Sequence, residues 1–211
     1  MTVVQPYPVL PDHTETTDVK ETLREEIRAQ RRRLGANVRT TAAEGFARLL
    51  TDLPVVREAS VVAAYANRPS EPATGPLLTR LTGAGVRVLL PALGPGLGRD
   101  WAWFTTADAL QSRSPGRPPE PDGPRLPGDA VAEADVVIVP ALAVDTSGAR
   151  LGQGGGWYDR VLADVPADVP VIAMVFAHEV YDAAVRPLPR EPHDRTVDAV
   201  CTPAEVIRLP R

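Results

Sequence analysis

Apolar residues in the first part of the chain recur at a helical spacing. This spacing predicts a helix over residues 18–34, with Leu23 and Ile27 on its apolar stripe, and a second helix over residues 41–50. Residues 1–17 show no such period and contain three prolines, which predicts a loose tail. We therefore expect the folded part of the chain to begin near residue 18.

From residue 61 onward, short apolar runs replace the helical stripes. Runs of this length are typical of buried strands, and predicted helices over residues 74–81 and 157–163 lie between some of them. A strand–helix–strand order favours a parallel sheet with right-handed crossovers. The pattern predicts a three-layer α/β fold, in which helices flank a mainly parallel central sheet and the N-terminal helices pack on that sheet. The expected strands are residues 61–66, 86–90, 101–105, 136–144, 170–176 and 199–202.

The composition narrows the class of protein without identifying it. A chain of 211 residues suits one domain, which we assign to residues 18–211. The net charge of −4 does not favour nucleic-acid binding, and the longest apolar run, nine residues, is too short to cross a membrane. Cys201 is the single cysteine, which excludes an internal disulfide and fits a reducing compartment. We expect a cytoplasmic protein with neither nucleic acid nor a membrane as partner.

The basic residues are unevenly divided, since the chain has 22 arginines and a single lysine, Lys20. A lysine in such a chain can mark a place that needs a compact ammonium group, although chance survival explains it equally well. Lys20 and Arg24 lie one helical turn apart on a common face. Further arginines extend this basic character, and a charge run of this kind is often only a solvated helix surface.

The glycine-rich stretch at residues 150–160, Arg-Leu-Gly-Gln-Gly-Gly-Gly-Trp-Tyr-Asp-Arg, carries the most chemical information. It lies between a predicted strand and a predicted helix, so free backbone N–H groups and the positive helix end can face an anion. Arg150 and Arg160 add charge suited to phosphate oxygens, and Asp159 could cap the helix or hold a metal ion. The spacing matches neither a Walker A loop nor a dinucleotide-binding motif, and an ordinary turn remains the alternative.

Two further loops bring acidic residues next to predicted strands. Glu71 follows the first strand, in a loop of the kind that binds ligands in α/β proteins, but it could equally stabilise the next helix. His193 and Asp194 precede the last strand, where they form either part of a site or a simple hydrogen-bonded loop pair. No serine has the sequence context of a nucleophile elbow, so the residues do not indicate a catalytic triad.

One long string of residues is specific enough to suggest a family. Pro140-Ala141-Leu142-Ala143-Val144-Asp145, followed by the glycine-rich stretch, strongly resembles the signature of the 5-formyltetrahydrofolate cyclo-ligase (5,10-methenyltetrahydrofolate synthetase) family. The resemblance implies ATP- and Mg²⁺-dependent cyclisation of 5-formyltetrahydrofolate to 5,10-methenyltetrahydrofolate. It further implies release of ADP and phosphate by way of a phosphorylated formyl intermediate, an iminium phosphate. We also expect a monomer.

The resemblance implies a role for each residue that matches the family pattern. Lys20, Arg150 and Asp159 are the implied catalytic residues, and Asp159 and Asp194 are the implied Mg²⁺ ligands. The implied ATP-binding residues are Lys20, Arg24, Arg150, Leu151, Gly152, Gln153, Gly154, Gly155, Gly156, Trp157 and Tyr158. The implied substrate-binding residues are Ala66, Glu71, Gln153, Gly154, Gly155, Gly156, Trp157 and Tyr158.

Three positions depart from the family pattern. Trp157 replaces the first of two tyrosines, Gln153 stands where an aromatic or basic residue is frequent, and Ala73 replaces a frequent acidic residue. We expect the changes at Trp157 and Gln153 to affect folate specificity rather than ATP binding, whereas Ala73 removes a second carboxylate from the implied site. Two alternatives therefore stay open: a paralogue that binds ATP but acts on another small substrate, and a non-enzymatic folate- or nucleotide-binding module.

Overall fold

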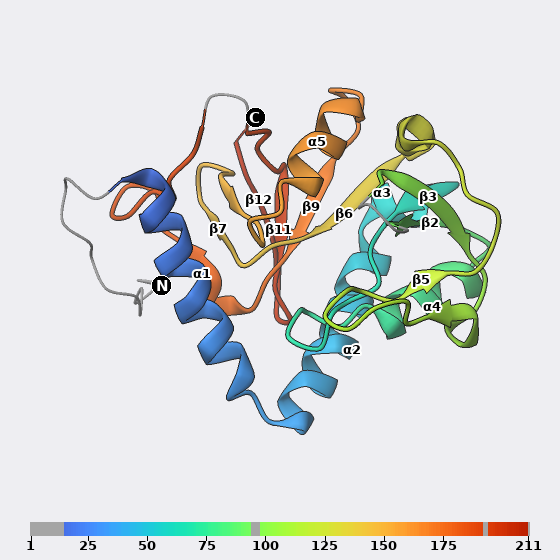
Figure 1. Cartoon of the computed structure of the whole chain (residues 1–211), viewed down its shortest axis with the longest axis horizontal. Coiled ribbons are helices and arrows are strands. Elements are labelled where there is room, and N and C mark those ends of the chain that lie inside the picture. The colour runs from blue at the N-terminus through green and yellow to red at the C-terminus, as the bar shows by residue number, and fades with distance from the viewer. Residues whose placement is uncertain (1–14, 94–97, 192–193, 211) are drawn as a thin grey trace.

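A seven-stranded sheet forms the centre of the protein (Figure 1). The computed structural model describes residues 15–93, 98–191 and 194–210. The strand order is β12-β11-β9-β6-β1-β2-β3; the five inner strands are parallel, and both edge strands are antiparallel to their neighbours. The predicted α/β class is confirmed. The strands are β1 (Val61–Ala63), β2 (Arg87–Ala92), β3 (Asp100–Phe104), β6 (Val136–Pro140), β9 (Val171–Met174), β11 (Ala199–Cys201) and β12 (Val206–Arg208).

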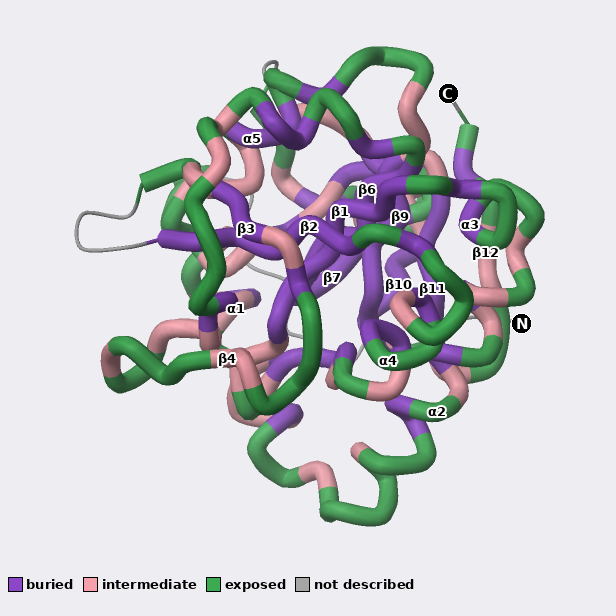
Figure 2. Tube along the Cα trace, turned by 90° about the vertical axis from the view of Figure 1, so that its right-hand side faces the viewer, coloured by how far each residue is buried: buried purple, intermediate pink, exposed green. Residues whose placement is uncertain are grey.

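Alternate residues of the central strands face two different hydrophobic layers. Val62 and Ile138 join the layer beneath helices α2 (Ala36–Asp52) and α4 (Gly75–Gly83), whereas Val137 joins the opposite layer beneath α5 (Trp157–Asp164). Figure 2 shows these strands buried at the centre and the exposed segments around them. Three layers are therefore present. The remaining short elements on these faces are α3 (Pro54–Arg57) and the 3₁₀ helix η2 (Gly128–Glu133).

A second, small sheet departs from the prediction. Residues 136–144 were predicted as one strand, but they form β6 and β7 (Ala143–Asp145), which belong to different sheets. The chain changes partner between them, because the Leu142 N–H donates to Leu151 O at 2.8 Å instead of continuing along β9. The small sheet has the order β10-β7-β8, with β8 at Arg150–Leu151 and β10 at Val180–Tyr181.

Helix α1 (Thr16–Arg32) packs against this small sheet, through Leu23 and Ile27, rather than against the central one. Only α2 of the two N-terminal helices covers the central sheet. Because α1 begins at Thr16, two residues of the predicted tail belong to the helix; residues 1–14 lie outside the described part of the chain. The other short elements are η1 (Ala107–Ala109), β4 (Leu110–Gln111), β5 (Glu120–Pro121) and η3 (Ala177–Glu179).

An ion pair is buried between α1 and η3. Arg31, one of the arginines that follow Arg24 in this helix, is fully buried and donates to both Glu179 carboxylate oxygens at 2.7 Å. Burial opposes the charge of Arg31, but the hydrogen bonds and charge of Glu179 outweigh it and raise the pKa of the guanidinium. Arg31 also donates to Ala141 O at 2.7 Å, so it joins α1 to the turn between β6 and β7.

No helix among the described residues is long and apolar enough to cross a membrane. This finding concerns residues 15–93, 98–191 and 194–210.

Gly45 offers a test of how closely α2 packs on the sheet. A Cβ atom at Gly45 would lie 2.3 Å from Pro203 O, a backbone atom that cannot move independently. Overpacking of this kind costs roughly 1–3 kcal/mol, which exceeds the gain of about 1 kcal/mol in helix propensity from alanine. We expect Gly45→Ala to lower the free energy of unfolding, measured by urea denaturation.

Gly83 is the matched control for this substitution, because it is also helical and a Cβ there would meet open space. We expect Gly83→Ala to leave the stability unchanged or slightly raised. Equal effects of the two substitutions would contradict the close α2–Pro203 contact.

Candidate active site

A cavity of about 540 Å³ lies where the inner strands end. Its wall includes Tyr65 and Ala66 after β1, Pro91 and Leu93 of the β2 end, and Pro140 at the end of β6. Carboxyl ends of parallel strands are the usual binding edge of α/β proteins. All fifteen predicted site residues line this one cavity: Lys20, Arg24, Ala66, Glu71, Arg150, Leu151, Gly152, Gln153, Gly154, Gly155, Gly156, Trp157, Tyr158, Asp159 and Asp194.

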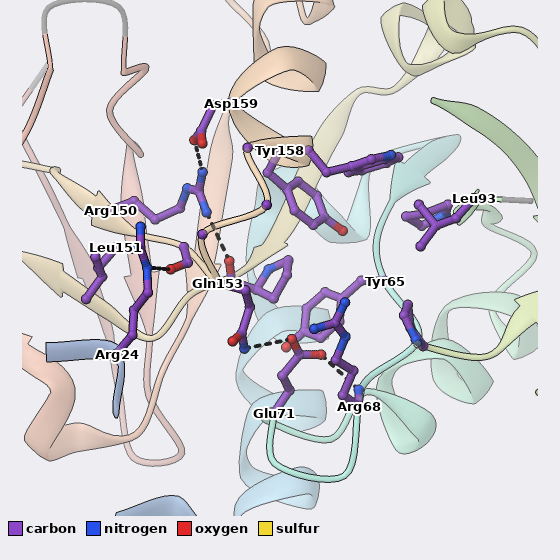
Figure 3. Close-up of a pocket in the computed structure, with 18 of the residues that line it drawn as sticks. Arg24, Tyr65, Arg68, Glu71, Leu93, Arg150, Leu151, Gln153, Tyr158 and Asp159 are labelled. Carbon is purple, nitrogen blue, oxygen red and sulfur yellow. Dashed lines mark hydrogen bonds and ion pairs between the residues drawn. The ribbon is translucent and has the colours of Figure 1, made fainter. Parts of the chain in front are cut away.

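The glycine-rich loop crosses one side of the cavity, between β8 and α5 (Figure 3). Gly154 has φ +95° and Gly156 has φ +59°, a region that side chains with a Cβ rarely adopt. A Cβ at Gly154 would also lie 3.2 Å from the Arg24 guanidinium carbon. Gly156 is the N-cap of α5, so the start of this helix faces the loop. Backbone conformation therefore favours glycine at both positions, and a side chain at residue 154 would also require the Arg24 guanidinium to shift.

Helix α1 holds this loop through two arginines. Arg24 Nε donates to Gly152 O at 3.0 Å, and Arg28 Nη2 donates to Gln153 O at 2.9 Å. Glu21 accepts from both guanidinium groups, at 3.1 and 3.2 Å. The hydrogen bond from Arg24 lowers the pKa of the Glu21 carboxyl; burial opposes this effect, and the weaker effect of the Arg28 hydrogen bond adds to it. The predicted basic face of α1 is therefore turned toward the loop and is not a freely solvated surface.

Arg150 and Asp159, which flank the glycine-rich loop, form an ion pair (Figure 3). The Arg150 side chain is only 3% exposed, whereas that of Asp159 is 38% exposed. Burial lowers the pKa of the Arg150 guanidinium, and the charge of Asp159 opposes that effect. The pair fixes a buried positive charge beside the loop amides, which suits a site for phosphate oxygens.

Lys20 and Asp194 meet at another part of the cavity wall. Lys20 Nζ lies 3.4 Å from Asp194 Oδ2 and 3.3 Å from Glu191 Oε1. Asp194 Oδ2 also accepts from the Glu191 backbone N–H at 2.9 Å. The residue next to it, His193, lies outside the described residues. Lys20, the single lysine of the sequence, therefore faces the cavity, and two carboxylates balance its charge.

The carboxylates of Asp159 and Asp194 suit Mg²⁺ chemically. Mg²⁺ takes oxygen ligands and is commonly held by one or two carboxylates together with phosphates and water. Within the described residues, no group of three or more His, Cys, Asp or Glu side chains could hold a metal ion. A site built from these two carboxylates would therefore depend on ligands from a bound phosphate and water.

A neighbouring part of the cavity wall is aromatic and acidic. Glu71 is 6% exposed, and burial, followed by the charge of Glu71, raises the pKa of Tyr65. Burial also raises the pKa of Tyr158, whose hydroxyl oxygen is buried without a hydrogen-bond partner among the described residues. Trp157 packs edge-on against Tyr158 at 4.8 Å between ring centroids. Flat aromatic faces and an unused hydroxyl suit a planar heterocyclic ligand.

Several lining residues were not predicted as site residues. Tyr65 was assigned to the strand predicted over residues 61–66, and no role was predicted for Arg68 or Glu191, yet all three line the cavity. Pro118 and Pro119 line it too; they lie in a proline-rich segment, residues 114–128, for which no binding role was predicted. Tyr65 lies two residues after the end of β1. This position was the available signal, because ligand-binding residues cluster at the carboxyl ends of such strands.

Fold and site together define an α/β protein with a glycine-rich loop and basic side chains at the carboxyl edge of its sheet. The model of the 5-formyltetrahydrofolate cyclo-ligase family matches residues 16–203. A 5-formyltetrahydrofolate cyclo-ligase of Mycolicibacterium smegmatis is 39% identical over 189 residues, covering 87% of this chain and 93% of that protein. The Escherichia coli K12 enzyme of that name is 32% identical, covering 85% and 98%.

A solved structure agrees with these sequence matches. The 5,10-methenyltetrahydrofolate synthetase of Aquifex aeolicus superposes with a TM-score of 0.74 at 26% identity, covering 90% of this chain and 93% of that chain. The chain belongs to the 5-formyltetrahydrofolate cyclo-ligase family. The resemblance stated from the signature residues is therefore confirmed; the roles of individual residues remain predictions.

Proposed function

We propose that this protein catalyses the ATP- and Mg²⁺-dependent cyclisation of 5-formyltetrahydrofolate to 5,10-methenyltetrahydrofolate, with release of ADP and phosphate. The single observation that carries the proposal is the convergence of all fifteen predicted site residues on one cavity. That cavity combines a basic, glycine-rich side with an aromatic and acidic side. Its two sides match the two substrates, a nucleotide triphosphate and a folate.

The reaction needs activation because the formyl oxygen is a poor leaving group. In the proposed first step, this oxygen attacks the γ-phosphorus of ATP, a P–O bond forms, and ADP leaves. The result is an iminium phosphate on N5 of the folate. N10 then attacks the formyl carbon and loses its proton, while the C–O bond breaks and phosphate departs with the former formyl oxygen. Phosphoryl transfer depends on charge neutralisation and in-line positioning more than on a protein nucleophile.

The basic side of the cavity supplies what the first step requires. Lys20 and the buried guanidinium of Arg150 place positive charge near the glycine-rich loop, where the phosphates would lie. Arg24 holds the loop through the Gly152 carbonyl, which leaves the backbone N–H groups of residues 154–156 available for phosphate oxygens. These groups would neutralise charge that develops during transfer.

Asp159 and Asp194 are the residues that would hold Mg²⁺. When bound, the ion would neutralise phosphate charge and orient the phosphate oxygens. Both carboxylates now pair with cationic side chains, Asp159 with Arg150 and Asp194 with Lys20. We infer that each cation can turn toward the phosphates when its carboxylate takes a metal. Each pair therefore balances its own charges in the free protein, and its two members would bind metal and phosphate in the substrate-bound protein.

The aromatic side would bind the folate. Glu71 offers a carboxylate for the polar edge of the pterin, and Trp157 and Tyr158 offer flat surfaces for its rings. The indole N–H of Trp157 donates to Gly98 O at 3.0 Å, so the ring is held at its edge. The replacement of tyrosine by tryptophan at this position therefore keeps a flat face but leaves no hydroxyl group for a ligand.

That replacement favours one second candidate, a paralogue that uses ATP to activate another small formylated or carboxylated substrate. The amide of Gln153 is engaged with Glu71 at 3.1 Å, which also distinguishes the folate side from the usual family pattern. Such a paralogue would bind ATP but leave 5-formyltetrahydrofolate unchanged.

The monomeric state and the cytoplasmic location of the protein remain predictions. Sedimentation equilibrium can check the first of them.

A spectroscopic assay separates the two candidates. Purified protein is mixed with 5-formyltetrahydrofolate, ATP and Mg²⁺, and the near-ultraviolet absorbance of the methenyl product is followed while each component is omitted in turn. The proposal predicts a signal that needs all three components and disappears when EDTA removes the metal. Absence of the signal from folded protein that binds ATP would instead support the paralogue.

A further inference from the structure

Three residues from distant parts of the chain form a line of hydrogen bonds along the cavity. Arg28 of α1 donates from Nε to Gln153 Oε1 at 3.2 Å, and Gln153 donates from Nε2 to Glu71 Oε1 at 3.1 Å. Figure 3 shows the second of these bonds between the glycine-rich loop and the loop after β1. The backbone N–H of Arg68 donates to the other Glu71 oxygen at 2.8 Å. The line therefore joins the basic side of the cavity to the acidic side.

The chemistry of the two ends fixes the direction of the Gln153 amide. A guanidinium has only donors, and a carboxylate has only acceptors. If the amide were reversed, its NH₂ group would face Arg28 and its oxygen would face Glu71, and both hydrogen bonds would be lost. Arg28 also donates to the Gln153 backbone carbonyl at 2.9 Å, so it holds both ends of this residue.

We infer that Gln153 couples nucleotide binding to binding at Glu71, and that Arg28 is the positioning residue that makes this coupling possible. The inference rests on the proposed function, since it takes the glycine-rich loop as the phosphate site and Glu71 as a folate contact. Gln153 belongs to both: its backbone is part of the loop, and its side chain holds the Glu71 carboxylate. Arg28 itself does not line the cavity and acts through Gln153.

The coupling has a simple physical origin. The hydrogen bonds of Gln153 already connect the loop to Glu71 in the free protein, so phosphates that restrict the loop backbone further also restrict Glu71. The entropy of ordering these groups is lost once, so a second ligand binds to a site that is already ordered. By thermodynamic linkage, each ligand must strengthen the binding of the other by the same factor. Removing Arg28 or the Gln153 side chain should uncouple the two sites, because the hydrogen bonds that join them are lost.

Calorimetric titration of the full-length protein tests the coupling. The dissociation constant of 5-formyltetrahydrofolate is measured with and without a saturating non-hydrolysable ATP analogue and Mg²⁺. We expect the analogue to tighten folate binding by about 5-fold or more in the unmodified protein, the lower end of typical allosteric coupling. In Arg28→Ala, the ratio should fall toward 1 while the analogue alone still binds. In Gln153→Ala, the ratio should also fall toward 1.

Arg32→Ala is the matched control, because Arg32 is an exposed arginine on the same helix and does not line the cavity. It should retain the coupling of the unmodified protein. A purely structural role for Arg28 would weaken both ligands without changing the ratio. The inference is overturned if the unmodified protein shows no coupling, or if Gln153→Ala retains it.

Two further measurements distinguish failure of this inference from failure of the proposed function. Turnover of 5-formyltetrahydrofolate by the unmodified protein tests the function alone. A double-mutant cycle of Glu71→Ala and Gln153→Ala, followed by urea unfolding without ligands, tests the bridge alone. Non-additive changes in the unfolding equilibrium constant support the bridge whatever the substrate is, and additive changes overturn it.

Discussion

Asp159→Ala is expected to reduce kcat/KM for methenyltetrahydrofolate formation by roughly 10²- to 10³-fold, close to abolishing turnover. The substitution removes one of the two proposed Mg²⁺ ligands, and it also removes the carboxylate that pairs with the buried Arg150 guanidinium. Both losses act on the phosphates of ATP rather than on the folate. Initial rates measured by the methenyl absorbance, across a range of Mg²⁺ concentrations, check this expectation.

Asp164→Ala provides the control, since Asp164 ends the same helix and pairs with exposed Arg99 at 3.0 Å. It should turn over substrate at the normal rate. Asp159→Asn adds a second test, because an amide keeps the size of the side chain and an acceptor for Arg150 but is a weaker metal ligand. Normal activity of a folded Asp159→Ala variant would contradict the proposed role of Asp159 as a Mg²⁺ ligand.

The largest expected loss of stability follows from Arg31→Ala. This change leaves the fully buried Glu179 carboxylate without its main partner, and breaking one side of a buried pair costs about 3–5 kcal/mol. The Ala141 carbonyl loses its donor as well. We expect a corresponding decrease in the free energy of unfolding, measured by urea denaturation monitored by circular dichroism.

Two further variants test whether this loss of stability comes from the buried ion pair. Arg80→Ala breaks an exposed ion pair with Glu44 and should cost no more than about 1 kcal/mol. The double variant Arg31→Met with Glu179→Leu replaces the pair by apolar side chains and should recover much of the stability, because no unpaired charge remains. A loss for Arg31→Ala as small as that for Arg80→Ala would contradict the buried pair.

The sequence predicted the central sheet well because each inner strand is a short apolar run buried on both faces. It did not predict the end of β6, since apolar residues continue from Val136 through Val144 in an unbroken run. Hydrophobicity cannot report a change of hydrogen-bonding partner, such as that of Leu142 from the large sheet to the small one. The edge strand β12 was missed for a related reason, as Val206–Arg208 is too short to show a period.

The candidate site was predicted mostly through its signature residues. Local chemistry alone left Glu71 and the glycine-rich loop open to ordinary structural interpretations, and the family pattern decided between them. Neither the local chemistry nor the family pattern could predict contacts between distant segments. Arg31 and Arg28 looked alike in a run of basic residues, yet one is buried against Glu179 and the other hydrogen-bonds Gln153. Only the packing of α1 on the small sheet distinguishes them.

The central claim is that ATP activates the formyl oxygen by phosphoryl transfer at this cavity. The most direct test uses 5-formyltetrahydrofolate that carries ¹⁸O in the formyl group, with unlabelled ATP and Mg²⁺, and mass analysis of the phosphate released. The proposed route predicts one ¹⁸O atom in each phosphate that accompanies a methenyl product. Product formation with unlabelled phosphate, and the label in water, would contradict it.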